Sequence, residues 1–551
     1  MNINITRPLG AAAAVLCLLV SALAQQNSSS QPAPIRSQMT AEKWREDLRF
    51  FAERMPATHK NLFHKMSKVE FDAAVKHLDE KIPTLADHEV IVELMRIIAK
   101  VGDGHTGAHS AQFLFAGGVY PVQFHLFEDG LHIRRASAEH ANVNGGRVVR
   151  IGDLSAEEAM KRVAEIVWRD NDMGIKDIGP RLLSSPQVLH ALRISNSLES
   201  VKITVMKDGR EVTAEMKPDA KAADLRTATT SLVDSRASGT AQPLWLKNPG
   251  DNFWYEFLPE KKVMFVQFNA VQNKQNETVE AFFNKVFDFA EKNPVEKLVL
   301  DLRMNGGGNN FLNLPLTLRA IRSPLNQTGK FFVIIGRETF SAAQNTVNEL
   351  EKYTNVIFVG EPTAATPNHY GDAARITLPN SKLTVQASTL WWQDADPRDR
   401  RQWKAPDVAA DLTFDAYRQG RDPAMEAIQA YKPSMSLNAI VADARSTQNV
   451  DQFITRLREF EANPAHKYAE TEAVINDAGY FLLGSDRVED AIRLFALNVE
   501  LHSRSVNVYD SLGEAYLKKG DKTNALLNYK KALAIDPTYR TALEAVRSLT
   551  Q

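Results

Sequence analysis

Cysteine is nearly absent from this sequence, and neither sign of charge dominates it. Cys17 is the one cysteine among 551 residues, and 66 lysines and arginines stand against 67 aspartates and glutamates, which leaves a net charge of −1. A chain this poor in cysteine has neither a disulfide framework nor a thiolate metal site. A net charge near zero creates no field that would attract DNA, RNA or an anionic membrane. Nucleic acid is therefore not expected as a partner.

The first 24 residues have the pattern of a secretory signal peptide. Residues 1–24 carry Arg7, then an apolar run, and end in an Ala-Leu-Ala triplet. Its removal would give an exported chain, periplasmic or secreted, with no integral membrane segment. Because Cys17 lies inside it, the mature chain would contain no cysteine. Residues 25–38 have the polar, proline-containing composition of a disordered linker.

Two segments of different pattern follow. Residues 39–100 are expected to form an N-terminal helical domain, in which Ser67 and Glu70 make a Ser-x-x-Glu capping box. Residues 119–215 combine short strands with a helical middle and close in a hairpin whose turn is Asp208-Gly209. This pattern favours a PDZ-like insert, although generic β-hairpins give the same signal.

Residues 216–430 alternate short apolar strands with helices. The expected strands lie at 263–268, 297–302, 331–336 and 355–360, and the expected helices at 278–292, 311–321 and 342–353. Such alternation is typical of a layered α/β core. Residues 101–118 would add a histidine-bearing loop to this core.

The C-terminal part repeats itself. Three pairs of residues are each 34 positions apart, namely Gly479 and Gly513, Ala491 and Ala525, and Phe495 and Tyr529. This is the tetratricopeptide period, so we expect such repeats over residues 466–551, after a helical linker at 431–465. Because two repeats seldom suffice alone, they would pack on neighbouring helices or on a protein partner.

The segment RETFSAAQN, residues 337–345, gives Ser341 two possible roles. With Gln344 it forms a Ser-x-x-Gln capping box, in which the serine side chain accepts the glutamine N–H. It also sits where a strand ending at Gly336 turns into a helix, and the free N–H groups of a helix start favour developing negative charge. There the Ala342 N–H could stabilise an oxyanion. The position suits a helix cap and a nucleophile equally, so the choice between these two roles depends on other motifs.

Two glycine-rich segments could supply the rest of a catalytic site. VGDGHTGAHS, residues 101–110, places His105 on a bendable loop, and its Gly-x-Gly-x-x-Gly spacing is no dinucleotide site because it follows a helix and opens none. KLVLDLRMNGGGNN, residues 297–310, runs from a buried strand into Gly306 and Gly307, whose N–H groups could face an oxyanion. No cofactor is expected, and no metal site, since no His-Glu-x-x-His motif occurs.

Together, GDGHT, DLRMNGGG and TFSAAQ followed by VGEPT resemble the tail-specific, or C-terminal processing, serine protease family, in its tricorn-core and retinoid-binding-protein-like branch. The resemblance covers roughly residues 40–430. It implies a core of the ClpP/crotonase type, often with an inserted PDZ domain, and peptide-bond cleavage through an acyl-enzyme. Carried over by position, it implies Ser341 as nucleophile, His105 as general base, and Gly306 or Gly307 with Ala342 as oxyanion hole.

The sequence departs from the family in two respects. Many members use a lysine about two dozen residues after the serine, but AATPNHYGD at that place contains none, and His369 there is a rival base to His105. The branch places a carboxylate before the closing Pro-Asp, where Asp399 is the nearest acid. Asp399 is therefore expected to orient the imidazole, with Asp372 and Glu361 as alternatives.

The leading interpretation is an exported serine endopeptidase that hydrolyses extended or C-terminal peptide segments, with tetratricopeptide repeats that recruit a protein partner. Two other classes fit the same residues. One is a catalytically inactive member that binds peptides or other ligands on the same fold, and the other is a scaffold whose repeats carry the function.

Overall fold

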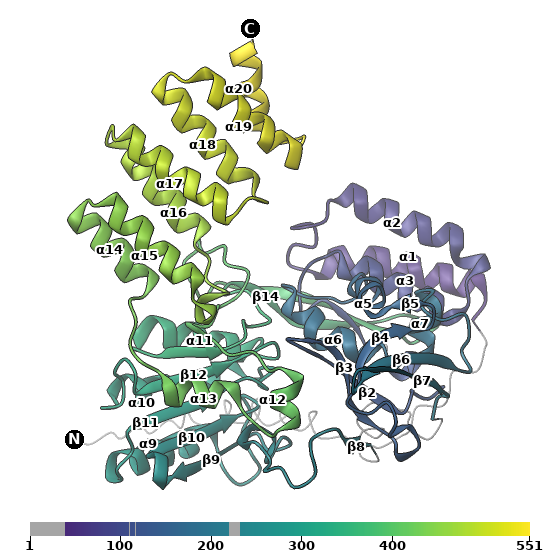
Figure 1. Ribbon diagram of the computed structural model, residues 1–551. Coiled ribbons are helices and arrows are strands. Elements are labelled where there is room, and N and C mark those ends of the chain that lie inside the picture. Colours follow the sequence, from purple (N-terminus) through teal and green to yellow (C-terminus); the bar gives the residue numbers. More distant parts are fainter. Residues whose placement is uncertain (1–38, 110, 116, 220–231, 551) are drawn as a thin grey trace, which may run out of the picture. The chain divides into compact units, whose positions relative to one another are not determined.

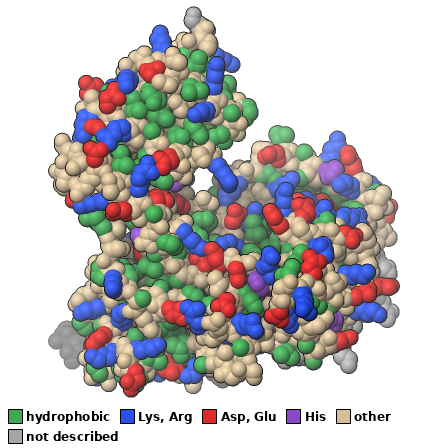
Figure 2. All heavy atoms as spheres, in the orientation of Figure 1, with side chains coloured by type: hydrophobic (Ala, Val, Ile, Leu, Met, Phe, Trp, Pro, Cys, Tyr) green, Lys and Arg blue, Asp and Glu red, His purple; other side chains and the backbone are tan. Residues whose placement is uncertain are grey.

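The computed structural model describes residues 39–109, 111–115, 117–219 and 232–550 (Figure 1). The expected signal peptide and linker lie outside these residues. None of the helices in the described ranges is long and apolar enough to cross a membrane. On the face shown in Figure 2, acidic and basic side chains are interspersed.

Three helices open the described chain, namely α1 (Ala41–Thr58), α2 (Lys68–Lys81) and α3 (Asp87–Ala99). The predicted capping box at the start of α2 is confirmed, because the Ser67 side chain accepts the Glu70 N–H and the Glu70 carboxylate accepts the Ser67 N–H. Apolar residues of these helices belong to the same hydrophobic core as those of the next segment. The helical domain and the insert therefore share one core.

The insert is built on an antiparallel sheet. Its strands are β2 (Val122–Phe127), β3 (Gly130–Ala136), β4 (Arg147–Ile151), β6 (Val201–Lys207) and β7 (Arg210–Met216), and its helices are α5 (Ala156–Ala164), α6 (Met173–Leu182) and α7 (Pro186–Ala191). The predicted hairpin is confirmed: β6 and β7 are joined by Asp208 and Gly209, with φ of 50° and 76°. Positive φ at both turn residues is what a two-residue hairpin requires.

A six-stranded sheet forms the second core. Its order is β16 (Val408–Ala409), β13 (Ile357–Gly360), β12 (Phe331–Ile335), β11 (Lys297–Asp301), β10 (Val263–Phe268) and β9 (Phe253–Leu258), all parallel except β9. Helices α9 (Val279–Lys292), α10 (Leu314–Arg322) and α11 (Ala342–Tyr353) cover one face, and α13 (Pro423–Ala430) covers the other (Figure 1). The four predicted strands and three predicted helices are confirmed within a few residues.

A long hairpin connects the two cores and was not predicted. It consists of β14 (His369–Thr377) and β15 (Thr384–Trp392), and β15 also pairs with β1 (Gly107–His109), which follows the His105 loop. The far end of the hairpin contacts α1, where the Asp47 carboxylate accepts the N–H groups of Asn380 and Ser381. This hairpin brings the histidine loop to the α/β core.

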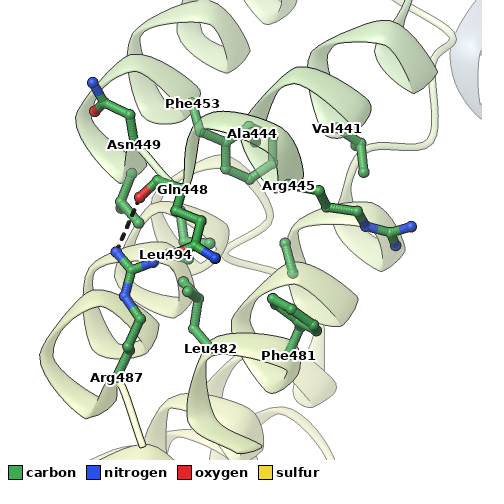
Figure 3. A pocket seen from close by; sticks show the side chains of 12 residues that line it. Val441, Ala444, Arg445, Gln448, Asn449, Phe453, Phe481, Leu482, Arg487 and Leu494 are labelled. Carbon is green, nitrogen blue, oxygen red and sulfur yellow. Dashed lines mark hydrogen bonds between the residues drawn. The ribbon is translucent and has the colours of Figure 1, made fainter. Parts of the chain in front are cut away.

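The C-terminal part consists of helical hairpins. They are α14 (Leu437–Thr447) with α15 (Val450–Ala462), α16 (Glu472–Gly484) with α17 (Val488–Leu501), and α18 (Val506–Lys519) with α19 (Lys522–Ile535), followed by α20 (Arg540–Thr550). The segment expected as a linker thus holds a further hairpin, which shares a hydrophobic core with α16 and α17. An apolar pocket lies between α14–α15 and α16–α17, with the Phe481 ring at its edge (Figure 3).

The 34-residue period has a structural counterpart. A methyl group on Gly479 would lie 2.5 Å from the Phe495 ring, and one on Gly513 would lie 3.0 Å from the Tyr529 ring. In both hairpins the glycine of the first helix therefore lets the aromatic ring of the second pack against its backbone.

Candidate active site

The loop between α3 and β1 carries His105, and the buried carboxylate of Asp103 binds the main chain of this loop. One oxygen of Asp103 accepts the N–H groups of His105 and Thr106, at 2.7 and 3.0 Å, and the other accepts the Thr106 hydroxyl and Nε2 of His59 at 2.7 Å. The Ser388 hydroxyl of β15 donates to the first of these two oxygens. Burial alone would raise the pKa of Asp103, but the hydrogen bonds from His59, Thr106 and Ser388 lower it to about 2.

His59 supports this carboxylate in a defined tautomer. Its Nδ1 accepts the N–H of Asn61 at 2.9 Å, so the ring proton lies on Nε2 and is donated to Asp103. Both side chains are almost completely buried. The pair fixes the backbone conformation of the loop on which His105 stands.

Ser341 lies at the sharp turn between β12 and α11. Its backbone has φ 55° and ψ −127°, a conformation in which a Cβ is strained. The side chain makes no capping hydrogen bond; the Gln344 N–H goes to the main-chain oxygen of Ser341, and the Gln344 amide donates to Asn348. The capping-box interpretation of Ser341 is therefore wrong, because the strained turn points its hydroxyl away from the helix start.

The side chains of Ser341 and His105 lie within hydrogen-bonding distance of each other. Nε2 of His105 is 2.9 Å from Oγ of Ser341, and the Phe340 ring stacks on the imidazole with centroids 4.4 Å apart. Burial lowers the pKa of His105 below its usual value of 6.5, although the charges of Asp103 and Asp372 and the Tyr370 main chain favour the protonated ring. A neutral imidazole with its proton on Nδ1 can accept the serine hydroxyl proton at Nε2.

The glycine loop contacts the nucleophile directly. Gly307 has φ 101°, and a methyl group on it would lie 2.6 Å from Cβ of Ser341 and 2.9 Å from the N of Ala342. Its N–H, however, donates to the Asn305 side chain at 2.9 Å. The N–H groups of Gly306 and Ala342 donate to no residue in the described part of the chain. Of the three expected oxyanion donors, Gly306 and Ala342 are therefore free, and Gly307 serves to let the loop approach Ser341.

His369 lies beside the pair but does not contact Ser341. Its ring is parallel to that of His105, with centroids 5.6 Å apart, and Nδ1 hydrogen-bonds the Thr366 carbonyl oxygen at 3.2 Å. Burial, with some help from the neighbouring His105, lowers the pKa of His369 to about 4, so the ring is neutral at physiological pH. The geometry favours His105 over His369 as the base.

Asp399 does not reach His105, contrary to the expectation. Its carboxylate accepts four hydrogen bonds from Arg401, three from the guanidinium and one from the main-chain N–H, and Arg401 in turn pairs with Glu351 on α11. The physical reason is local, since Arg401 follows two residues later and its guanidinium turns back onto the acid. Asp399 is thus part of an ion-pair network behind the site.

The two alternative acids, Glu361 and Asp372, also pair with residues other than His105. Glu361 pairs with the buried Arg337, which also donates to the Leu126 carbonyl oxygen of the insert. Asp372 accepts the indole N–H of Trp392 at 2.5 Å and acts on His105 only through its charge. Nδ1 of His105 is buried and has no side-chain acid as a partner.

Four residues that support His105 and its loop were not predicted from the sequence, namely His59, Asp103, Asp170 and Phe340. Asp103 and Phe340 lie within the quoted motifs, two residues and one residue before the reactive side chains. Their acidic and aromatic character was the available signal. His59 and Asp170 lie far away in sequence, and only the fold brings them to the loop. No cluster of three or more histidine, cysteine, aspartate or glutamate side chains suited to a metal occurs in the described ranges.

No protein-family profile matches this sequence, and no curated protein matches it either. Solved structures do. Mature CPAF is 12% identical with a TM-score of 0.48, and the match covers 74% of this chain and 98% of that chain. The photosystem II D1 C-terminal processing protease is 11% identical with a TM-score of 0.33, covering 71% and 97%. The tricorn protease is 15% identical with a TM-score of 0.33, covering 71% and 36%. The solved structures to which this chain is similar thus include a C-terminal processing protease.

Proposed function

We propose that this protein is a serine endopeptidase that cleaves peptide bonds through an acyl-enzyme at Ser341. The observation that carries the proposal is the 2.9 Å contact between Nε2 of His105 and Oγ of Ser341. A neutral base at this distance from a serine hydroxyl meets the geometric requirement for nucleophilic catalysis.

In the proposed reaction, Oγ of Ser341 attacks the peptide carbonyl carbon while Nε2 of His105 takes the hydroxyl proton. The negative charge on the carbonyl oxygen is stabilised by the unpaired N–H groups of Ala342 and Gly306 and by the start of α11. His105 then gives its proton to the leaving amine, and the C–N bond breaks. A water molecule, deprotonated by the same nitrogen, then attacks the ester carbonyl; the bond to Oγ of Ser341 breaks, and Nε2 returns the proton to Oγ.

The strained backbone of Ser341 supports the assignment. A non-glycine residue at φ 55° and ψ −127° costs about 1–3 kcal/mol and persists only where the surroundings impose it. A helix cap would need no such conformation, whereas an exposed nucleophile at a strand-to-helix turn does. The absence of any capping bond from its side chain leaves the hydroxyl for His105.

The finer architecture belongs to the same proposal. We assign the α/β part to the ClpP/crotonase-like type, residues 119–215 to a PDZ-like insert, and the C-terminal hairpins to the tetratricopeptide type. Export to the periplasm or out of the cell is part of the same proposal, and the signal-peptide pattern of residues 1–24 supports it. Its substrates would be extended protein segments, with C-terminal tails preferred.

Hydrolysis of an unstructured reporter peptide tests this function. The peptide should be supplied with a free and with an amidated C-terminus, because a tail-specific enzyme should cleave the free form faster. Ser341→Ala should abolish turnover of both forms. Binding of the peptide without any turnover by the wild type would instead identify a catalytically inactive member of the fold.

The helical hairpins are proposed to recruit a protein partner. The support is the Gly–aromatic packing repeated at 34-residue spacing and the exposed Phe481 at the pocket of Figure 3. Gly479→Ala should disorder these hairpins, since the new methyl group would meet the Phe495 ring, while Gly484→Ala, where nothing lies within 4 Å, should not. Both variants should turn over a short peptide at the wild-type rate, because neither glycine is near Ser341 in the fold.

A further inference from the structure

A buried carboxylate of the insert contacts the catalytic loop one residue before His105. Asp170 comes from the segment between α5 and α6, and its Oδ1 accepts the N–H of Gly104 at 2.7 Å. Among the described residues, Asp170 is thus the acceptor of the Gly104 N–H. The insert thus holds the backbone of the loop at the peptide unit adjacent to the residue proposed as general base.

Gly104 is packed between this carboxylate and the aromatic ring that supports the imidazole. A methyl group on Gly104 would lie 2.7 Å from the Phe340 ring and 3.4 Å from Cγ of Asp170. Phe340 itself stacks on His105 and immediately precedes Ser341. A movement of Asp170 would therefore shift Gly104 against Phe340 and change the alignment of His105 with Ser341.

The segment that carries Asp170 is fixed at both sides of this contact. The Asn171 side-chain amide donates to the carbonyl oxygens of Thr363 and Gln402, at 3.1 and 2.8 Å, which attaches the segment to the α/β core. Before it, the Trp168 ring lies against Gly107, where a methyl group would come within 2.9 Å of the indole. The carboxylate is thus presented by a rigid segment anchored to the α/β core and to the histidine loop.

The second oxygen of Asp170 is buried and has no hydrogen-bond partner within the part of the chain that the structure describes. The charged groups that face the carboxyl are Asp103, on the loop itself, and Lys65, whose ammonium donates to the Asp170 main-chain oxygen. Burial and the like charge of Asp103 raise the pKa of Asp170 to about 7. Because folding raises this pKa, the protonated carboxyl of Asp170 contributes stability at low pH. This contribution is lost as the pH rises toward 7.

We propose that Asp170 is a positioning residue for His105: its hydrogen bond to the Gly104 N–H sets the imidazole in line with Ser341 and so couples the insert to catalysis. This role rests on the proposed function of the His105–Ser341 pair. The ionised carboxylate is the stronger acceptor for the Gly104 N–H, so the alignment tightens as Asp170 loses its proton.

Two measurements on the full chain test the role, one of them independent of catalysis. Hydrogen exchange of a peptide spanning residues 101–106 reports whether Asp170 holds the loop, and the rate of fluorophosphonate labelling at Ser341 reports the alignment. The variants are Asp170→Ala, which removes the acceptor, and Asp170→Asn, which keeps a neutral one. Asp172→Asn is the matched control, because its side chain is 74% exposed and its carboxylate pairs with Arg169 alone among the described residues.

Asp170→Ala should raise exchange at the loop and slow labelling by about tenfold or more, since small misplacements of a catalytic group have effects of this size. Asp170→Asn should restore most of the rate and remove an ionisation near pH 7 from the labelling profile, and Asp172→Asn should match the wild type. Unchanged exchange and labelling in Asp170→Ala would overturn the proposal, as would an Asp170→Asn variant that raises exchange and slows labelling as much as Asp170→Ala. Altered exchange with no labelling of the wild type would refute the proposed function but leave the contact in place.

Discussion

Nε2 of His105 lies 2.9 Å from Oγ of Ser341, although 236 residues separate them in sequence. The histidine stands on a loop fixed by Asp103, and the serine on a strained turn fixed by the glycine loop. Two segments that have no local reason to meet are thus brought to hydrogen-bonding distance by the β1–β15 pairing and the α/β sheet. The contact makes the pair a candidate for nucleophilic catalysis.

Ser341→Gly should stabilise the protein. Glycine adopts φ 55° and ψ −127° without the Cβ strain of serine, so we expect a gain of about 1 kcal/mol in the free energy of unfolding. Ser341→Ala, which keeps the strain, should be close to the wild type. Chemical denaturation of the three proteins measures this, and a loss of about 1 kcal/mol in Ser341→Ala would restore the helix-cap role.

Gly307→Ala should strongly reduce the labelling of Ser341, whereas Gly306→Ala should have a mild effect. The methyl group at residue 307 would meet Ser341 and Ala342 and would need φ 101°, whereas nothing lies within 4 Å of one at residue 306. We expect a loss of labelling of about a hundredfold or more for Gly307→Ala. Equal effects of the two substitutions would argue that the glycine loop does not pack on the nucleophile.

Asp399→Asn should leave the reactivity of Ser341 within about threefold of the wild type, because the carboxylate pairs with Arg401 and never meets His105. The rate of fluorophosphonate labelling measures this, and Arg401→Gln is a suitable companion variant. A loss of the size caused by His105→Ala would return Asp399 to the position of third catalytic residue.

His369→Gln should flatten the acid limb of the stability profile. Because the pKa of His369 falls from its unfolded value of 6.5 to about 4 on folding, its neutral ring contributes stability above pH 6.5 that is lost as the pH falls toward 4. The slope from this one group is at most about 1.4 kcal/mol per pH unit. Unfolding curves between pH 4 and 7 give the comparison, and a slope unchanged by the substitution would contradict the buried, neutral state.

Much of the α/β core and the positions of Ser341 and His105 could be predicted because their signals are local. Buried strands, glycines after a strand and a serine before a helix are each visible within about ten residues. The hypothesis that His105 is the base came from the GDGHT motif and the family resemblance that the motif carries.

The predictions that the structure does not support concern residues whose partners cannot be read from a local sequence pattern. Asp399 was chosen for its place in the chain, but Arg401 captures its carboxylate. Gly307 was expected as an oxyanion donor, but its N–H turns back to Asn305. The hairpin of β14 and β15 spans both cores and shows its function only through its contacts. The α14–α15 hairpin has Arg445 and Glu461 at the positions where the next hairpin has Gly479 and Phe495.

Fluorophosphonate labelling of the full-length protein, with Ser341→Ala and His105→Ala beside the wild type, tests the central claim most directly. The account predicts one label per chain on Ser341, none in either variant, and a rate that falls in acid with a midpoint below pH 6.5, because burial lowers the pKa of His105. Labelling that persists in His105→Ala with the wild-type pH profile, or a wild type that does not react where a control serine protease does, would contradict it.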